Sequence, residues 1–278
     1  MKKFSSVIVA SLITAAVFSG CKAKVKINND YDETLTTVKQ CNIDTQSECS
    51  AFELSLKTGN ITVTPTDKDV PTMNLECTVF ADNEDTCKDV SEHISTVIME
   101  KDGNLKLAIT EKETGQEIEK WIEDTETKAR VEFNAEIGIP ASYTTVDADV
   151  QIGNITFDGI TGELLAYANV GNITCTGSTF TEDSYIECNT GNISCSKCTW
   201  NSTNLIKVDT GNIIFGLPNE DSVNGDLAIE VRKGNLTFDN GSEYKIEGDP
   251  DKGNAKLTKS GCSINAAVIS GKLNLDKE

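Results

Sequence analysis

One short motif recurs along the second half of this 278-residue chain. In each copy a glycine is followed, two and four places on, by apolar residues, and in every copy except the last an asparagine follows the glycine directly. Successive glycines are 18, 20, 20, 23, 19 and 18 residues apart; they are Gly153, Gly171, Gly191, Gly211, Gly234, Gly253 and Gly271. Self-similarity at such a period is typical of chains whose copies stack on one another. An earlier copy, TGNITV at 58–63, contains Gly59.

The residues around each glycine alternate in character with a period of two. The apolar positions after the glycines are Ile155, Ile173, Ile193, Ile213, Leu236, Ala255 and Leu273, then Phe157, Cys175, Cys195, Phe215, Phe238, Leu257 and Leu275. Mostly polar residues stand between them, and a second alternating segment precedes most of the glycines. This pattern predicts half-buried strands, two short ones in each copy.

Two short strands cannot bury an apolar face alone, so the copies are expected to stack about 4.8 Å apart. The predicted fold class is all-β, a β-solenoid or parallel β-helix-like stack; an antiparallel sandwich of hairpins is the alternative. The glycines suit backbone turns with positive φ. The asparagines after them are expected to form a side-chain ladder; they are Asn154, Asn172, Asn192, Asn212, Asn235 and Asn254.

The pattern before the repeat is less regular. A short helix is expected over 85–93, a hairpin over 94–100 and 105–109, and a strand over 131–139. The chain is therefore divided into a signal peptide (1–20), a tether (21–49), an irregular β portion (50–140) and a regular β-repeat stack (141–278).

The N-terminus predicts export and lipid attachment. Two lysines precede a short apolar run over 7–17, which is followed at once by Phe18-Ser19-Gly20-Cys21. The run is too short to span a membrane and suits a secretory signal. A cysteine after small residues is the acceptor in bacterial lipoprotein processing, although Phe18 departs from the usual leucine. Cys21 is the predicted lipidation site, which places the chain in the cell envelope, at the cell surface or on a periplasmic membrane face.

The charge balance limits the partners. The chain has 25 Lys and Arg residues against 44 Asp and Glu residues, for a net charge of −19. Such a surface repels nucleic acid and anionic membranes. The expected partners are a membrane, reached through the lipid anchor, and a protein or glycan ligand of unknown identity.

Ten cysteines in an exported chain favour disulfides. Closeness in sequence predicts a pair between Cys41 and Cys49 and another between Cys77 and Cys87. Positions in neighbouring copies predict Cys175 with Cys195 and Cys188 with Cys198, with a swap among these four left open. Cys262 is then the odd thiol.

No set of residues points to catalysis or to a cofactor. His93 is the single histidine, which excludes a site with several histidine ligands. Arg130 and Arg232 are the only arginines, too few for the Arg- and Lys-rich clefts of polysaccharide-cleaving β-helix enzymes. The acidic loops at 82–85 and 249–251 lack the spacing of known calcium motifs. No catalytic, metal or cofactor residues are therefore expected.

One stretch resembles a known family. The run IPAS at 139–142, then VQIGNITFDGITGEL at 150–164 and NVGNITCTGS at 169–178, is similar to the bacterial putative-adhesin domain of unknown function. Gly159 and Gly162 match that family's second glycine pair, and the resemblance covers roughly residues 50–278. It implies a β-solenoid-like stack on exported, often lipid-anchored, bacterial proteins, and the family has no agreed catalytic residues. The cysteines among the copies depart from its pattern.

These observations predict a lipid-anchored envelope module that binds or scaffolds and does not catalyse. The first alternative is an envelope sensor or accessory lipoprotein that acts through another envelope protein. A polysaccharide-cleaving β-helix enzyme is the remaining alternative.

Overall fold

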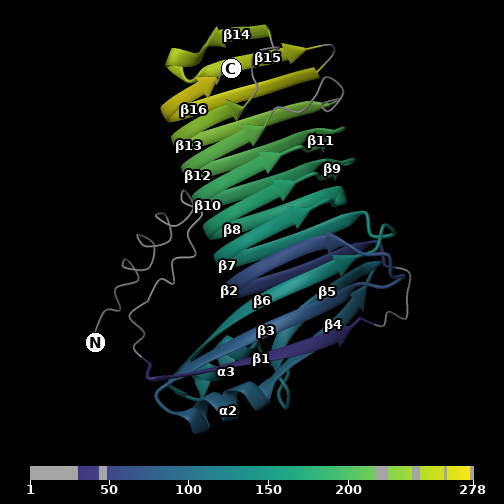
Figure 1. Ribbon diagram of the computed structural model, residues 1–278, viewed down its shortest axis with the longest axis vertical. Coiled ribbons are helices and arrows are strands. Elements are labelled where there is room, and N and C mark those ends of the chain that lie inside the picture. Colours follow the sequence, from purple (N-terminus) through teal and green to yellow (C-terminus); the bar gives the residue numbers. More distant parts are fainter. Residues whose placement is uncertain (1–30, 44–48, 217–224, 240–244, 260–261, 276–278) are drawn as a thin grey trace.

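The computed structural model describes residues 31–43, 49–216, 225–239, 245–259 and 262–275 (Figure 1). The fold is all-β, with one large mixed sheet that is open because β1 and β14 form its two edges. The sheet order is β1-β3-β6-β2-β7-β8-β10-β12-β13-β16-β15-β14. The strands are β1 (Glu33–Asn42), β2 (Ala51–Pro65), β3 (Thr72–Ala81), β4 (Ile94–Lys101), β5 (Asn104–Glu111), β6 (Ala129–Ile139), β7 (Thr145–Asp158), β8 (Thr161–Thr176), β9 (Thr179–Phe180), β10 (Ser184–Ser196), β11 (Thr199–Trp200), β12 (Asn204–Gly216), β13 (Asp226–Asp239), β14 (Lys245–Asp249), β15 (Asn254–Lys259) and β16 (Cys262–Leu275).

The repeats form a parallel, in-register stack in the order β2, β7, β8, β10, β12, β13 and β16. Each copy in this stack is one long strand and not the two short strands expected from the sequence. Residues three places before and two places after each glycine are both buried, although five positions separate them. In a straight strand such residues face opposite sides. The strand therefore bends at the glycine, so that a first arm before it and a second arm after it face the same core.

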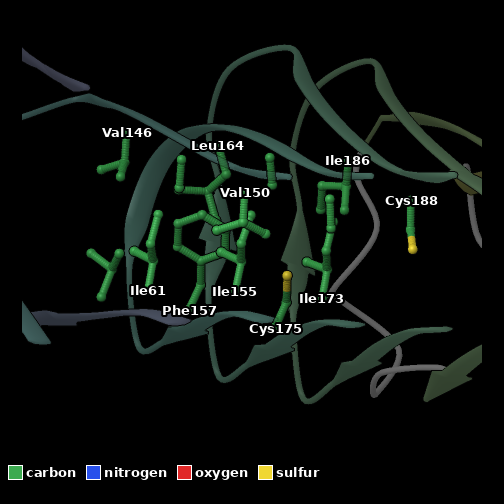
Figure 2. Packing of buried hydrophobic residues seen from close by; sticks show 14 of the residues in the cluster. Ile61, Val146, Val150, Ile155, Phe157, Leu164, Ile173, Cys175, Ile186 and Cys188 are labelled. Atoms are coloured by element: carbon green, nitrogen blue, oxygen red, sulfur yellow. The ribbon is translucent and has the colours of Figure 1, made fainter. Parts of the chain in front are cut away.

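Both arms supply the core. Val146, Leu164 and Ile186 come from first arms, and Ile155 and Ile173 come from second arms; all five are at most 1% exposed. Figure 2 shows these side chains filling the space inside the bent strands. The alternation predicted from the sequence is confirmed, since buried and partly exposed residues alternate along both arms.

The stacked glycines have φ between 140° and 154°, which confirms the expected positive φ. A Cβ atom on Gly171 or Gly191 would lie 1.5 Å from the carbonyl oxygen of the stacked glycine before it. No side chain fits against that backbone, because the neighbouring strand is hydrogen-bonded in place. Glycine at the bend is thus required both by its φ and by the close approach of the next strand.

The predicted stack is wrong at Gly253, because this copy is not part of the parallel stack. β15 pairs antiparallel with β16, and β16 pairs directly with β13, so Gly271 and not Gly253 stacks on Gly234. Gly253 has φ 77° and ends a 3₁₀ turn, η2 (Pro250–Lys252). The proline and the turn reverse the chain, and β14 and β15 form an antiparallel hairpin at this edge.

The early copy at Gly59 belongs to the stack, whereas its sequence position predicts the irregular portion. β2 pairs with β7 so that Gly59 is opposite Gly153, 94 residues later. On its other edge, β2 pairs with β5 over 51–54 and with β6 over 59–65. The intervening chain includes helices α2 (Glu84–His93) and α3 (Ile118–Asp124). The predicted helix and the predicted hairpin, here β4 and β5, are confirmed.

Part of the expected tether is structured. Residues 33–42 form β1, which pairs antiparallel with β3 along its whole length. The threonines and Val38 suit an extended edge strand. Among the described residues, no helix has the length and apolar character needed to cross a bilayer.

Candidate binding surface

The outer sides of the two arms differ in chemistry. One and three places after the glycines, the second arms from β2 to β13 present amides and, except for Ile214, hydroxyls. We call these residues the amide–hydroxyl face. From β2 to β13 they are Asn60, Asn154, Asn172, Asn192, Asn212 and Asn235, then Thr62, Thr156, Thr174, Ser194, Ile214 and Thr237. None of the twelve is charged, on a chain with a net charge of −19. Asp158 stands in the next outward column.

A continuous ladder of hydrogen bonds holds the asparagines. From Asn60 to Asn212, each Oδ1 accepts two hydrogen bonds from the next asparagine, one from its backbone N–H and one from its Nδ2, at 2.8 to 3.1 Å. The predicted ladder is therefore confirmed from Asn154 to Asn235, and Asn60 extends it; Asn254, in the antiparallel hairpin, is outside it. From Asn60 to Asn212 each Oδ1 has used both lone pairs, whereas Asn235 Oδ1 accepts one hydrogen bond, from the Lys272 backbone N–H at 3.1 Å. Each Nδ2 keeps one N–H outside the ladder.

The ladder continues beyond β2 into a hollow. Asn60 Nδ2 donates to Asn134 Oδ1 at 2.6 Å, and Asn134 Nδ2 donates to Glu76 Oε1 at 2.9 Å. These three residues line a cavity of about 560 Å³, which adjoins a second one of about 530 Å³. Thr62, Asn74 and Glu136 line both. We call the two together the β2–β6–β3 hollow.

The first arms present a different surface, which we call the charged face. It comprises the residues two, four and six places before the glycines, among them Asp147, Asp149, Tyr185, Glu187 and Lys207. Glu187 pairs with Lys207 and accepts a hydrogen bond from the Tyr185 hydroxyl. Burial, with help from nearby Glu53 and Asp149, raises the pKa of Asp147 to about 6.

The structure brings three of the repeat cysteines together. Cys175 and Cys195 are opposite each other on β8 and β10, and Cys198 Sγ donates to the Cys175 carbonyl oxygen at 3.4 Å. Cys188 is on the first arm, where its Sγ donates to the Gly171 carbonyl oxygen at 3.3 Å. All four are buried thiols in the structure. The two disulfides stay predictions, and the geometry groups Cys198 with Cys175 and Cys195 and not with Cys188.

Burial makes these thiols poor nucleophiles. It raises the pKa of Cys188 and of Cys198 to about 12, and a hydrogen bond with Cys175 together with burial raises the pKa of Cys195. A thiol with such a pKa stays protonated at neutral pH. Reduced, these side chains act as small apolar core residues.

The other predicted disulfides also stay predictions. Cys77, on β3, and Cys87, on α2, are buried thiols, and burial raises the pKa of Cys77 to about 12. Cys49 is buried at the start of the described segment before β2. The side chains of Cys41 and Cys262 lie outside the described residues, as does the lipidation site Cys21.

His93 has a structural environment at the end of α2. Its ring stacks on Trp121 with centroids 4.7 Å apart, and Nδ1 lies 2.8 Å from the Asp89 carbonyl oxygen. In the part of the chain that the structure describes, no group of three or more His, Cys, Asp and Glu side chains is placed to hold a metal ion.

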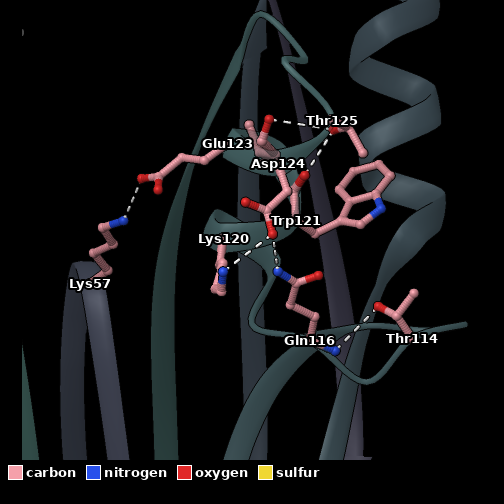
Figure 3. Close-up of polar contacts among 9 residues, drawn as sticks. Lys57, Thr114, Gln116, Lys120, Trp121, Glu123, Asp124 and Thr125 are labelled. Atoms are coloured by element: carbon pink, nitrogen blue, oxygen red, sulfur yellow. Dashed lines mark hydrogen bonds and ion pairs between the residues drawn. The ribbon is translucent and has the colours of Figure 1, made fainter.

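Helix α3, which the sequence reading missed, is held by its own polar contacts (Figure 3). Asp124 accepts hydrogen bonds from Gln116 at 2.6 Å and from Lys120 at 3.2 Å. Glu123 forms an exposed ion pair with Lys57 of β2 at 2.9 Å. The Lys57–Glu123 ion pair connects α3 to the first arm of β2.

Comparison with known proteins gives similarity in structure alone. The sequence matches no family model, and no curated protein matches it. Similar solved structures are a putative adhesin from Bacteroides fragilis NCTC 9343 (11% identity, 87% of this chain and 96% of that chain, TM-score 0.42) and a putative cell adhesion protein from Clostridium sporogenes ATCC 15579 (13% identity, 88% and 100%, TM-score 0.42). A third is a putative lipid binding protein from Parabacteroides distasonis ATCC 8503 (11% identity, 87% and 97%, TM-score 0.32). With TM-scores below 0.5, these similarities do not indicate what this chain binds.

Proposed function

We propose that this protein is a lipid-anchored, non-catalytic binding or scaffolding module of the bacterial cell envelope, and that its stack is a β-solenoid. The observation that carries the proposal is the amide–hydroxyl face, an uncharged and regular surface on a strongly acidic chain. Such a chain repels anions over most of its surface, whereas this face adds no repulsion of its own.

The ladder makes this face rigid before any ligand arrives. Every Oδ1 from Asn60 to Asn212 is fixed by two hydrogen bonds from the next asparagine. Side chains that are already ordered lose little entropy when a ligand binds, which favours affinity. Binding without chemistry is also consistent with repeat thiols that are buried and protonated at neutral pH.

The anchor is tested at Cys21. The full chain should incorporate labelled palmitate and remain with the membranes, and the Cys21→Ala variant should lose the label and become soluble. Protease added to whole cells distinguishes the two envelope locations, since only a chain at the cell surface is cut. Palmitate labelling that persists in the variant would refute lipidation at Cys21.

The binding role is tested with the soluble Cys21→Ala chain. When envelope fragments from the cells that express it are sedimented, the protein should be carried into the pellet in a saturable manner. Bovine serum albumin at equal concentration should stay in solution. Binding that never saturates, or no binding, would refute the proposed module.

A further inference from the structure

We propose that the β2–β6–β3 hollow is a binding site for a neutral polysaccharide, whose chain continues along the amide–hydroxyl face. This inference rests on the proposed binding function and adds the chemical class of the ligand. It is carried by the hydrogen-bonding groups that line the hollow, by its charge and by its connection to the ladder.

The lining offers acceptors and donors side by side. Glu76 and Glu136 supply carboxylate oxygens, and Asn60, Asn74 and Asn134 supply amides. A sugar hydroxyl is at once a donor and an acceptor, so adjacent hydroxyls on one ring are matched by a carboxylate next to an amide. Glu76 and Asn134 are fixed relative to each other by their 2.9 Å hydrogen bond, which orders this pair in advance.

The charge in the hollow selects against acidic ligands. Glu76 and Glu136 line the first cavity. Lys68 is the one cationic side chain among the described lining residues, and it lines the adjoining cavity. An acidic glycan or nucleic acid would bring its anions close to these carboxylates within a chain of net charge −19. A neutral glycan avoids that repulsion and still uses the carboxylates as strong acceptors.

The hollow also has an apolar part. Val38 of the edge strand β1 lines the larger cavity and is 61% exposed. Sugar rings have apolar C–H surfaces as well as hydroxyls, and Val38 gives such a surface a place to pack. The combination of an exposed aliphatic side chain with amides and carboxylates therefore suits a sugar ring better than a fully polar ion.

The ladder gives the ligand a direction. From the hollow, Asn60, Asn154 and Asn172 follow one another on neighbouring strands, about 4.8 Å apart. Each has one Nδ2 hydrogen outside the ladder, and a threonine hydroxyl stands two residues further along the same strand. A polymer that starts in the hollow thus meets the same donor and hydroxyl on β2, β7 and β8, which a single small molecule would not use.

The test measures binding of the soluble Cys21→Ala chain to a panel of purified polysaccharides. Neutral glucan, mannan and galactan are compared with polygalacturonate, and a polyalanine-based peptide is included. At least one neutral polymer should bind, and more tightly than polygalacturonate or the peptide. Glu136→Gln and Asn134→Ala should each weaken that binding by about tenfold, the factor for one lost hydrogen bond of 1.4 kcal/mol.

Matched variants on the charged face serve as controls. Glu230→Gln and Asn189→Ala remove a carboxylate and an amide from first arms, and both should leave the affinity unchanged, with melting temperatures confirming that all four variants fold. Equal losses at the two faces, or tighter binding of polygalacturonate, would overturn the inference. If no neutral polymer binds while envelope fragments still do, the inference fails and the binding module stands.

Discussion

The two outer faces of the stack sit on the same strands and cover the same core, yet they differ in composition. First arms mix acids, bases, tyrosines and leucines, whereas second arms repeat asparagine and mostly threonine. The inner columns of both arms are apolar and buried. Packing of the core therefore does not explain the difference.

Hydrogen bonding explains the asparagine column but not the hydroxyl column. Each asparagine needs another asparagine next to it, because the ladder uses both an amide acceptor and an amide donor. Stacked threonines have no such requirement, and Ile214 shows that another side chain is accommodated there. The absence of charge in that column agrees with a surface that meets a neutral partner.

The largest expected effect is on the bend shared by both arms. Gly191→Ala should lower the free energy of unfolding by more than about 5 kcal/mol, because its Cβ would lie 1.5 Å from the Gly171 carbonyl oxygen. Gly177→Ala is the control, since Gly177 also has positive φ but no atom within 4 Å of an added Cβ. Urea denaturation of both variants measures the difference, and equal losses would show that φ alone, and not the close stacking, requires glycine.

The next effect separates the core from the amide–hydroxyl face. Ile193 is fully buried. Ile193→Asp should lower the free energy of unfolding by about 4 kcal/mol, because apolar contacts are lost and a carboxylate is buried. The neighbouring Ser194→Asp should change stability by less than about 0.5 kcal/mol, because its side chain faces outward. Thermal melts that shift equally would contradict the alternation of inward and outward residues.

A smaller effect is expected within the ladder. Asn192→Ala removes the acceptor of both the backbone N–H and the Nδ2 of Asn212, at 3.1 and 3.0 Å. The loss should be about 2 kcal/mol, because a partly buried backbone donor is left without its partner. Asn189→Ala on the charged face loses only side-chain hydrogen bonds, to Tyr167 and Asn169, and should cost less. The reverse order would mean that the ladder adds little rigidity.

The smallest effect concerns the charged face and its pH dependence. The pKa of Asp147 is raised from its ordinary value of 3.8 to about 6, chiefly by burial. Between these two pH values the folded chain therefore keeps a proton on Asp147 that the unfolded chain has released. The contribution of Asp147 to stability therefore falls as pH rises from about 4 to 6. Asp147→Asn should raise stability by about 1 kcal/mol at pH 7, after allowance for solvent screening, and leave it unchanged near pH 3. A variant that gains nothing at pH 7 would show that the carboxylate is not strained there.

Local patterns predicted the strands of the stack, α2, the β4–β5 hairpin and the asparagine ladder. They failed where the pairing is nonlocal, since nothing near Gly59 indicates that it stacks on Gly153. They also failed at Gly253, where the motif letters persist but Pro250 and a 3₁₀ turn reverse the chain. Ile118, Trp121 and Ile122 have the helical spacing that would have revealed α3.

The β2–β6–β3 hollow was missed for the same reason. Asn74, Glu76, Asn134 and Glu136 are polar residues at outward positions of alternating strands, which the sequence does show. Their meeting depends on the order β3-β6-β2, which joins segments 58 to 74 residues apart in sequence. The composition of the site was thus readable, but its assembly was not.

The most direct test of the account compares one added carboxylate on each face. Soluble Cys21→Ala protein that also contains Ser194→Asp or Asn189→Asp is titrated against envelope fragments, after thermal melts have confirmed that both variants fold. Binding should fall about tenfold or more with Ser194→Asp, because the new charge lies on the amide–hydroxyl face, and should be unchanged with Asn189→Asp. Unchanged binding with Ser194→Asp together with a loss for Asn189→Asp would place the binding surface on the charged face and contradict the account.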